Sequence, residues 1–212
     1  MKLVLNDHEL SANPARPATL GAALLDVQQN HLTEDQVISA IFVDGSPLTA
    51  KLLSQWKDRP ASDFAEARIE APCRSVLACQ GLRILAQGLA ESQQDRSRIV
   101  ELFCQGRPAQ GMQLLTGYLN LWNSTQATLA SAARLLAVDL EDLPTTADPT
   151  DPLGTVGQYI ARLAEQLQQL KNALEAQDYV LTGDILEYEF APLTDEWQSV
   201  LTALADQYEN HP

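Results

Sequence analysis

Residues 112–136 read MQLLTGYLNLWNSTQATLASAARLL. Within them a set of mostly apolar residues, here called a stripe, recurs at alternating steps of three and four positions. An α-helix makes one turn in about 3.6 residues, so these steps place the side chains on one face of a helix. The stripe consists of Met112, Leu115, Leu119, Trp122, Gln126, Leu129, Ala133 and Leu136. The pattern predicts a long amphipathic helix over residues 108–138, with Pro108 in its first turn.

Two more stripes with the same spacing follow toward the C-terminus. They consist of Val156, Ile160, Leu163, Leu167, Leu170 and Leu174, and then of Trp197, Leu201, Leu204 and Tyr208. Helices of this kind bury their apolar faces against each other, which predicts an all-α bundle of four to six helices over residues 73–212. Gln126 would sit within the first stripe, where it either fixes helix register or lies at the rim.

Residues 1–72 have a different pattern, that of a small β-rich module. Asn6 and Asp7 suit a tight turn between two short strands, and Thr19 can cap a following helix. The predicted elements are strands at Lys2–Leu5, Glu9–Ala12, Val37–Val43 and Ala67–Glu70, with a helical turn at Leu52–Trp56. The whole chain is therefore predicted to be α+β, with a β-rich module before the helical bundle.

This order of elements resembles the β-grasp family, the ubiquitin-like and sulfur-carrier fold. The resemblance is carried by Lys2–Leu5, by Thr19-Leu20 at the helix start, and by Ile41-Phe42-Val43-Asp44-Gly45. Members of the family act through a free Gly-Gly tail, whereas here the module continues into Ala71-Pro72-Cys73. The resemblance therefore implies a docking module and not a conjugated tag.

Between the module and the first stripe the sequence predicts helix interrupted by small residues. Gly81 and Gly88 each cost a helix about 1 kcal/mol relative to alanine. Two glycines in one helix suggest the close approach of a neighbouring helix, and a break is the alternative. Ser92 is a candidate cap for the next helical stretch.

The second half of the bundle contains a proline-rich connection. Residues 139–154 hold three prolines and five acids without a base, which predicts a loop. The helix that starts at Thr155 either continues through Gln177-Asp178 or bends there. Pro192 is predicted to stop it, and Thr194 with Asp195 and Glu196 to open the last helix.

Charge is distributed very unevenly along the chain. Residues 1–134 carry 12 Lys and Arg against 13 Asp and Glu, whereas residues 135–212 carry two against 15, within a total of −14. Such a field repels phosphate backbones and anionic bilayers, so nucleic acid and membrane are not expected partners. A basic protein partner is one reading of the acidity, and a solvated face is the other.

The sequence favours a soluble, cytoplasmic protein. No apolar run approaches the roughly 18–20 residues that span a bilayer, and the N-terminus becomes polar too early for a secretory signal. The three cysteines, Cys73, Cys79 and Cys104, do not have the spacing of a zinc or redox motif. They are expected to be reduced thiols.

Motifs that carry catalysis or hold cofactors are absent from the sequence. The histidines are His8, His31 and His211, and they have no paired metal-ligand spacing. The sequence also lacks phosphate-binding glycine loops and nucleophile elbows. We therefore expect a protein that is not an enzyme and that has no catalytic residue, metal or cofactor.

The one segment that suggests a site is Asp178–Glu189, where acids alternate with tyrosines and aliphatic residues. Asp184 and Glu187 are three residues apart and share a helix face. A heptad count places Asp184 in the seam, whereas a 3.6-residue count leaves it at the margin. The carboxylates of Asp184, Glu187 and Glu189 are the candidate partner-binding groups. The simpler interpretation is that they lie on a solvated edge of the helix and have a structural role only.

These observations favour a non-enzymatic interaction protein, an adaptor or an assembly or secretion-type chaperone. Small acidic helical proteins resemble bacterial secretion and flagellar chaperones in composition. The alternative is an enzyme or cation-binding bundle that uses the Asp178–Glu189 carboxylates. A homo-oligomer in which one stripe is an intermolecular seam is a third possibility.

Overall fold

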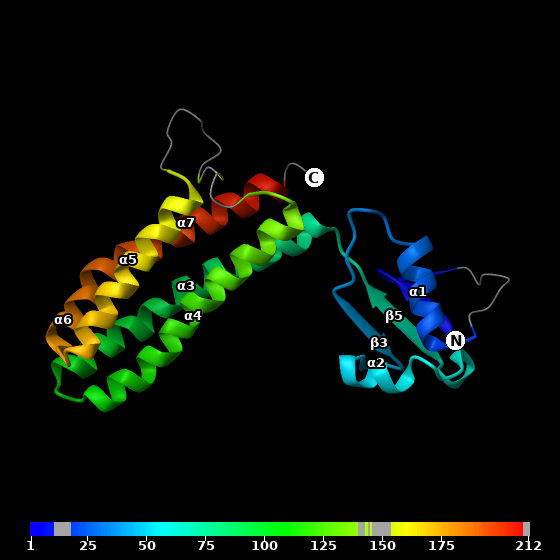
Figure 1. Ribbon diagram of the computed structural model, residues 1–212, viewed down its shortest axis with the longest axis horizontal. Helices are drawn as coiled ribbons and strands as arrows, with labels where there is room; N and C mark the ends of the chain where they lie inside the picture. Colours follow the sequence, from blue (N-terminus) through cyan, green and yellow to red (C-terminus); the bar gives the residue numbers. More distant parts are fainter. Residues whose placement is uncertain (11–17, 140–142, 144, 146–153, 210–212) are drawn as a thin grey trace. The chain divides into compact units, whose positions relative to one another are not determined.

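The computed structural model describes residues 1–10, 18–139, 143, 145 and 154–209. The chain divides into two compact units, Met1–Arg74 and Ser75–Pro212, and each is described by itself (Figure 1). The first unit contains a five-stranded mixed sheet, and the second is helical. The predicted α+β class is confirmed.

The sheet of the first unit has the order β2-β1-β5-β3-β4. Its strands are β1 (Lys2–Leu5), β2 (His8–Glu9), β3 (Ala40–Val43), β4 (Ser46–Pro47) and β5 (Glu66–Glu70). The pair of β1 and β5 is parallel, and the other pairs are antiparallel. Strand β5, the last strand in the sequence, therefore lies in the middle of the sheet, between β1 and β3.

Both hairpins turn on residues with left-handed backbone conformations. The φ angles are 47° and 65° at Asn6 and Asp7, and 49° and 79° at Asp44 and Gly45. Positive φ at both central positions matches the right-handed twist of the flanking strands, as the sequence predicts. The Asn6 side chain also donates to the Ala71 carbonyl and accepts from the Ala71 N–H, at 2.9 and 2.8 Å.

Helix α1 (Leu20–Asn30) packs against the sheet, and the core of the first unit lies between them. The helix begins with Thr19, whose hydroxyl accepts from the Ala22 N–H at 3.2 Å, as predicted. Its residues Leu20, Leu24 and Val27 pack in one cluster with residues of β3 and β5. A second helix, α2 (Ala50–Trp56), and a short 3-10 turn, η1 (Ala61–Asp63), complete the unit.

Two predicted strands have other bounds in the described part of the chain. Strand β3 begins at Ala40 and not at Val37, because the Val37 N–H bonds to the Pro72 carbonyl outside the sheet ladder. Strand β2 is His8–Glu9; the predicted strand extended to Ala12, and Ser11 and Ala12 lie outside the described residues.

The described part of the second unit consists of four helical segments, here called rods. They are α3 (Arg74–Cys104), α4 (Pro108–Leu136), α5 (Val156–Glu175), and a composite of α6 (Tyr179–Asp184), the π-helical turn η2 (Ile185–Glu189) and α7 (Phe190–Glu209). Figure 1 shows the rods lying side by side with α5 next to α7. Thr155 starts α5 with a capping box that includes Gln158. The predicted loop at 139–154 lies mostly outside the described residues.

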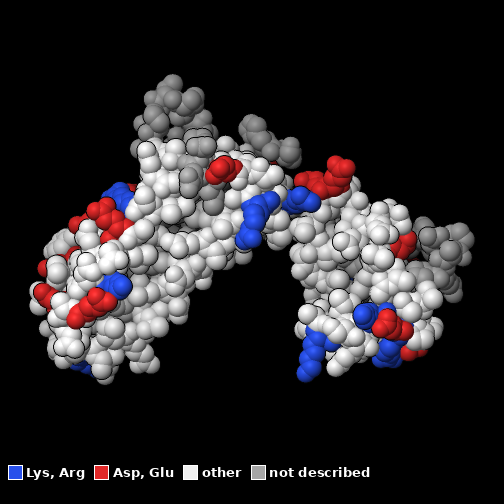
Figure 2. Space-filling view, viewed as in Figure 1, with Lys and Arg blue, Asp and Glu red and all other residues white. Residues whose placement is uncertain are grey.

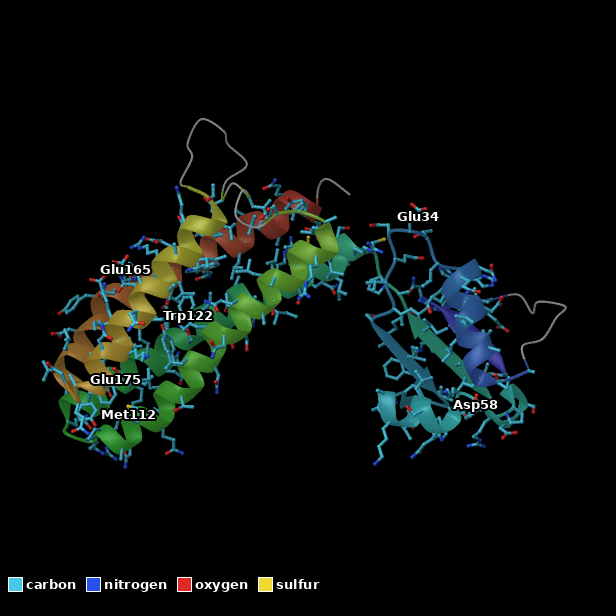
Figure 3. The ribbon with its side chains drawn as sticks, viewed as in Figure 1. Glu34, Asp58, Met112, Trp122, Glu165 and Glu175 are labelled. Carbon is cyan, nitrogen blue, oxygen red and sulfur yellow. The ribbon has the colours of Figure 1, made fainter. Side chains whose placement is uncertain are left out.

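Aromatic rings fill the centre of the bundle. Trp122 and Trp197 are buried, and their ring centroids lie 6.4 Å apart in an edge-to-face arrangement. Phe190 contacts Trp122 at 6.0 Å and Tyr118 at 6.1 Å. Figure 3 shows Trp122 among the rods. Gln126, by contrast, is exposed and therefore lies at the rim.

Helix α3 is continuous, which corrects the role expected for Ser92. Ser92 lies inside the helix, where its hydroxyl donates to the Leu89 carbonyl at 2.7 Å and caps nothing. The two glycines mark close approach to α4 instead of a break. A Cβ at Gly81 would lie 3.2 Å from Thr128 Cγ2, and one at Gly88 would lie 3.4 Å from Leu121 Cδ1.

Pro192 does not end a helix, and Thr194 does not begin one, so this prediction was wrong. Pro192 lies in the first turn of α7, directly after the π-helical turn. A widened π turn removes the clash that a proline ring makes with the preceding α-helical carbonyl. Thr194 is buried and its hydroxyl donates to the Phe190 carbonyl at 2.6 Å, as an interior threonine does.

Among the described residues, no helix has both the length and the apolar composition that a bilayer crossing requires.

Candidate functional site

The segment that the sequence singled out begins at a break between two helices. Gln177 has a left-handed backbone with φ of 54°, which ends α5. Asp178 then caps α6, and its Oδ1 accepts from the Leu181 N–H at 2.9 Å. The chain therefore bends at Gln177-Asp178, one of the two alternatives that the sequence left open.

The buried side chains of this segment come from both α6 and the π-helical turn. The buried face consists of Thr182, Gly183, Ile185 and Leu186. Asp184 is exposed, so the heptad count that placed it in the seam was wrong. Three large hydrophobic residues of this segment are exposed to solvent: Val180 is 77% exposed, Tyr188 71% and Leu181 46%.

Val180 and Tyr188 belong to a surface groove between α3 and the α6–η2 segment. The groove has a volume of about 200 Å³ and is here called the α3–α6 groove. It is lined by Val100, Phe103, Cys104, Val180, Gly183, Asp184, Glu187 and Tyr188. Gly183 faces Val100 across this groove: a Cβ at Gly183 would make an ordinary van der Waals contact with Val100 Cγ1, at 3.9 Å.

Phe103 anchors the buried side of the α3–α6 groove. Its ring stacks on that of Tyr179, with centroids 5.4 Å apart and planes inclined by 23°. On the α4 side the Phe103 ring leaves no room for a side chain at Gly111, because a Cβ there would lie 2.6 Å from the ring. Three helices therefore hold this ring in place.

Carboxylates border the exposed apolar residues. Asp184 and Glu187 line the α3–α6 groove, and Glu189 is exposed at the end of the same turn. Within the part of the chain that is described, none of the three forms an ion pair. The residues that line the groove include no Lys or Arg. Figure 2 shows acidic side chains spread over the end of the bundle where α5 and α6 lie.

The three cysteines differ in environment. Cys104 is exposed and lines the α3–α6 groove, whereas Cys79 is buried. Burial raises the pKa of the Cys79 thiol, and a hydrogen bond with Asp35 raises the pKa of Cys73. Cys104 is therefore the thiol that a reagent in solution reaches most readily.

No group of three or more His, Cys, Asp or Glu side chains that could hold a metal ion occurs among the described residues. Asp184, Glu187 and Cys104 all line the α3–α6 groove, but they do not form such a group. The two carboxylates form an anionic border around an apolar surface, which suits contact with a cation-bearing apolar ligand.

Sequence reasoning singled out the segment that carries Asp184 and Glu187 and missed three of the eight residues that line the groove. Val100, Phe103 and Cys104 come from α3, about 80 residues earlier in the chain. Their pairing with α6 depends on the antiparallel packing of the bundle. The only local sequence signal for these residues was that Ile99, Leu102 and Phe103 form a stripe on one helix face.

Comparison with known families gives two matches. Residues 1–71 match the TP0873 N-terminal domain, a range within the sheet-containing unit. Residues 92–200 match the Domain of unknown function (DUF8042), a range that begins in α3, ends in α7 and includes every residue of the α3–α6 groove.

No curated protein and no solved structure matches the chain. The second family match covers 109 of the 212 residues, more than half of the chain. The chain therefore belongs to the family described as Domain of unknown function (DUF8042).

Proposed function

We propose that this chain is a non-enzymatic interaction protein, an adaptor or assembly chaperone, that holds a basic amphipathic segment of a partner protein in the α3–α6 groove. The observation that carries the proposal is the coincidence of exposed apolar side chains with unpaired carboxylates. Val180 and Tyr188 would bury apolar area on binding, and Asp184 and Glu187 would meet basic side chains at the border.

The exposed tyrosine supports a binding role for this surface. Tyr188 is 71% exposed, although Phe190 and Trp197 of the same rod are fully buried in the core of the bundle. Tyrosines at binding surfaces contribute much area for little loss of side-chain freedom, and they are common among energetic hot spots. The π-helical turn that presents Tyr188 is a feature often found at functional sites.

For the first unit we propose a docking module of the β-grasp kind. The sheet order β2-β1-β5-β3-β4, with β1 and β5 parallel and α1 between β2 and β3 in sequence, supports this proposal. Because the strand β5 leads into α3, such a module would act by contact and not by transfer of its end.

The experiment is a pull-down from lysate of the native host with the full-length chain and two triple variants of equal net charge. One reverses the two groove acids and the neighbouring Glu189 (Asp184→Lys, Glu187→Lys, Glu189→Lys). The matched control reverses three exposed acids outside the groove (Asp58→Lys, Asp95→Lys, Glu165→Lys). Loss of a basic partner from the first variant alone supports the proposal, and equal recovery by both variants contradicts it.

A second candidate is a cation-binding or catalytic bundle, favoured by the position of Asp184 and Glu187 in the same groove. It would need further ligands from a bound molecule or from water. Elemental analysis of purified protein, with thermal melts in the presence of divalent cations, tests it. A metal-free protein whose melting temperature does not respond to these cations contradicts this candidate.

A further inference from the structure

The bundle buries one arginine on the core-facing side of α3. Arg96 is 9% exposed and lies on the helix face that also carries Ser92, Ile99 and Phe103. Its charge acts on the buried Tyr118 of α4: burial raises the pKa of the Tyr118 hydroxyl, and Arg96 opposes part of that rise. The Tyr118 hydroxyl lies 3.4 Å from Thr194 Oγ1 of α7.

Arg96 has no counter-charge among the described residues. No carboxylate lies within 4.0 Å of it, and its buried Nε atom has no hydrogen-bond partner. Arg83, Arg98 and Arg162 differ from Arg96, since they are exposed and each pairs with a carboxylate. Arg107 and Arg134 are exposed to solvent without an ion pair among the described residues. A buried N–H without a partner is unfavourable, because it loses hydration and gains no compensating hydrogen bond.

This arginine also lines a shallow hollow that is open to solvent and is formed by residues of α3. The hollow has a volume of about 410 Å³ and is lined by Gln93, Gln94, Arg96, Ser97, Arg98 and Glu101. Its only carboxylate, that of Glu101, already accepts from Arg98 at 2.6 Å. The Gln93 amide donates to the Asp195 carboxylate at 2.7 Å. The Gln94 amide, the Ser97 hydroxyl and the Arg96 guanidinium therefore remain to contact a ligand.

From this arrangement we propose that the hollow on α3 is an oxyanion site, in which Arg96 binds a carboxylate or phosphate group of a small ligand. A guanidinium presents two parallel N–H donors that match the two oxygens of such a group. Ser97 and the side-chain amide of Gln94 add neutral donors beside it. The bound anion supplies the counter-charge that the described residues do not give to Arg96.

The proposal is independent of the α3–α6 groove, because none of its lining residues belongs to that groove. It also assigns opposite charges to the two ligands: the groove would take a cationic partner, and the hollow an anion. An experiment with simple anions therefore tests the hollow without the protein partner.

The test is a titration of the full-length chain with sodium phosphate and with sodium acetate, each against sodium chloride at equal ionic strength, followed by calorimetry and by thermal melts. The two probes separate phosphate from carboxylate preference. We expect a saturable response to at least one of them, with a higher melting temperature than in chloride. A wild-type protein that responds to neither anion overturns the proposal without any variant.

Variants then locate the site. Arg96→Met removes the charge and keeps the stem volume, Arg96→Lys keeps the charge and loses the paired donors, and Arg162→Met is the control at an arginine outside the hollow. We expect affinity at least tenfold weaker in Arg96→Met, intermediate in Arg96→Lys and unchanged in Arg162→Met. Arg96→Met or Arg96→Lys with wild-type affinity contradicts the proposal.

Discussion

The ring of Tyr179 stacks on the ring of Phe103 at 5.4 Å, and this contact joins the start of α6 to the end of α3. It closes the buried side of the α3–α6 groove at the point where Gln177 ends α5. Stacked aromatic pairs add attraction beyond the apolar area that they bury. The shape of the groove thus depends on a contact between residues 76 positions apart in sequence.

Loss of this ring should destabilise the bundle. Phe103 is buried, so Phe103→Ala should lower the free energy of unfolding by about 3 kcal/mol or more. Phe103→Leu keeps most of the volume and should cost less than about 1.5 kcal/mol. Urea unfolding followed by circular dichroism measures both. Equal stability of Phe103→Ala and the wild type would show that the ring is not packed as described.

Two glycines of α4 should respond in opposite ways to alanine. At Gly111 a Cβ would lie 2.6 Å from the Phe103 ring, whereas at Gly117 no atom lies within 4 Å. We expect Gly111→Ala to destabilise by about 1–3 kcal/mol through overpacking. Gly117→Ala should stabilise by about 0.5–1 kcal/mol, because alanine favours the helix. The reverse order of the two melting temperatures would contradict the packing of α3 against α4.

High pH should destabilise the protein partly through Tyr118. Burial raises the pKa of Tyr118 above the ordinary value of 10.0, so the folded protein holds this proton longer than the unfolded chain does. Its contribution is complete below pH 10 and is lost as pH rises through the folded-state pKa, at up to about 1.4 kcal/mol per pH unit.

The measurement is a series of urea unfolding curves between pH 8 and pH 11.5 for the wild type and Tyr118→Phe. The variant should lose less stability over this range, because one of the groups with a raised pKa is gone. Tyr159 and Tyr208 have raised pKa values as well, so a residual slope is expected. Identical slopes for both proteins would refute the assignment to Tyr118.

The three thiols should react at different rates. Cys104 is exposed, whereas Cys79 is buried and has a raised pKa. We expect a maleimide at neutral pH to label Cys104 first, with the site identified by mass spectrometry. A labelled amphipathic helix of about 18 leucines and lysines, used as a model of the proposed partner, should then slow the labelling of Cys104.

A peptide of the same length with glutamate in place of lysine is the control. Because the border of the groove is acidic, this peptide should leave the rate at Cys104 unchanged. Protection of Cys104 by both peptides would mean that charge does not select the ligand. Protection by neither would argue against the groove as a binding surface.

Local sequence signals predicted much of the framework. Asn6 and Asp7 indicated the first hairpin, Thr19 the start of α1, and Pro108 the start of α4. Each of these positions is decided by backbone conformation or capping within a few residues, so a single sequence contains the information. The apolar stripes likewise predicted the helical bundle.

The errors arose where packing overrides local preference. Pro192 reads as a helix stop, yet the π-helical turn before it accommodates the ring. The same turn shifts the helix face, so neither the heptad count nor the 3.6-residue count predicted that Tyr188 would be exposed. Asp184, Glu187 and Glu189 were found from composition, whereas Phe103 and Val100 joined the site through tertiary packing alone.

The most direct test of the proposed groove is photocrosslinking in the native host from position 188. A photoreactive phenylalanine analogue would replace Tyr188 in one variant and Ile84 in the control; both residues are 71% exposed. Ile84 lies about 24 Å from Val100 along α3. We predict a crosslink to a basic segment of another protein from position 188 and not from position 84. The same products from both positions, or none from position 188, would contradict the proposed role of the α3–α6 groove.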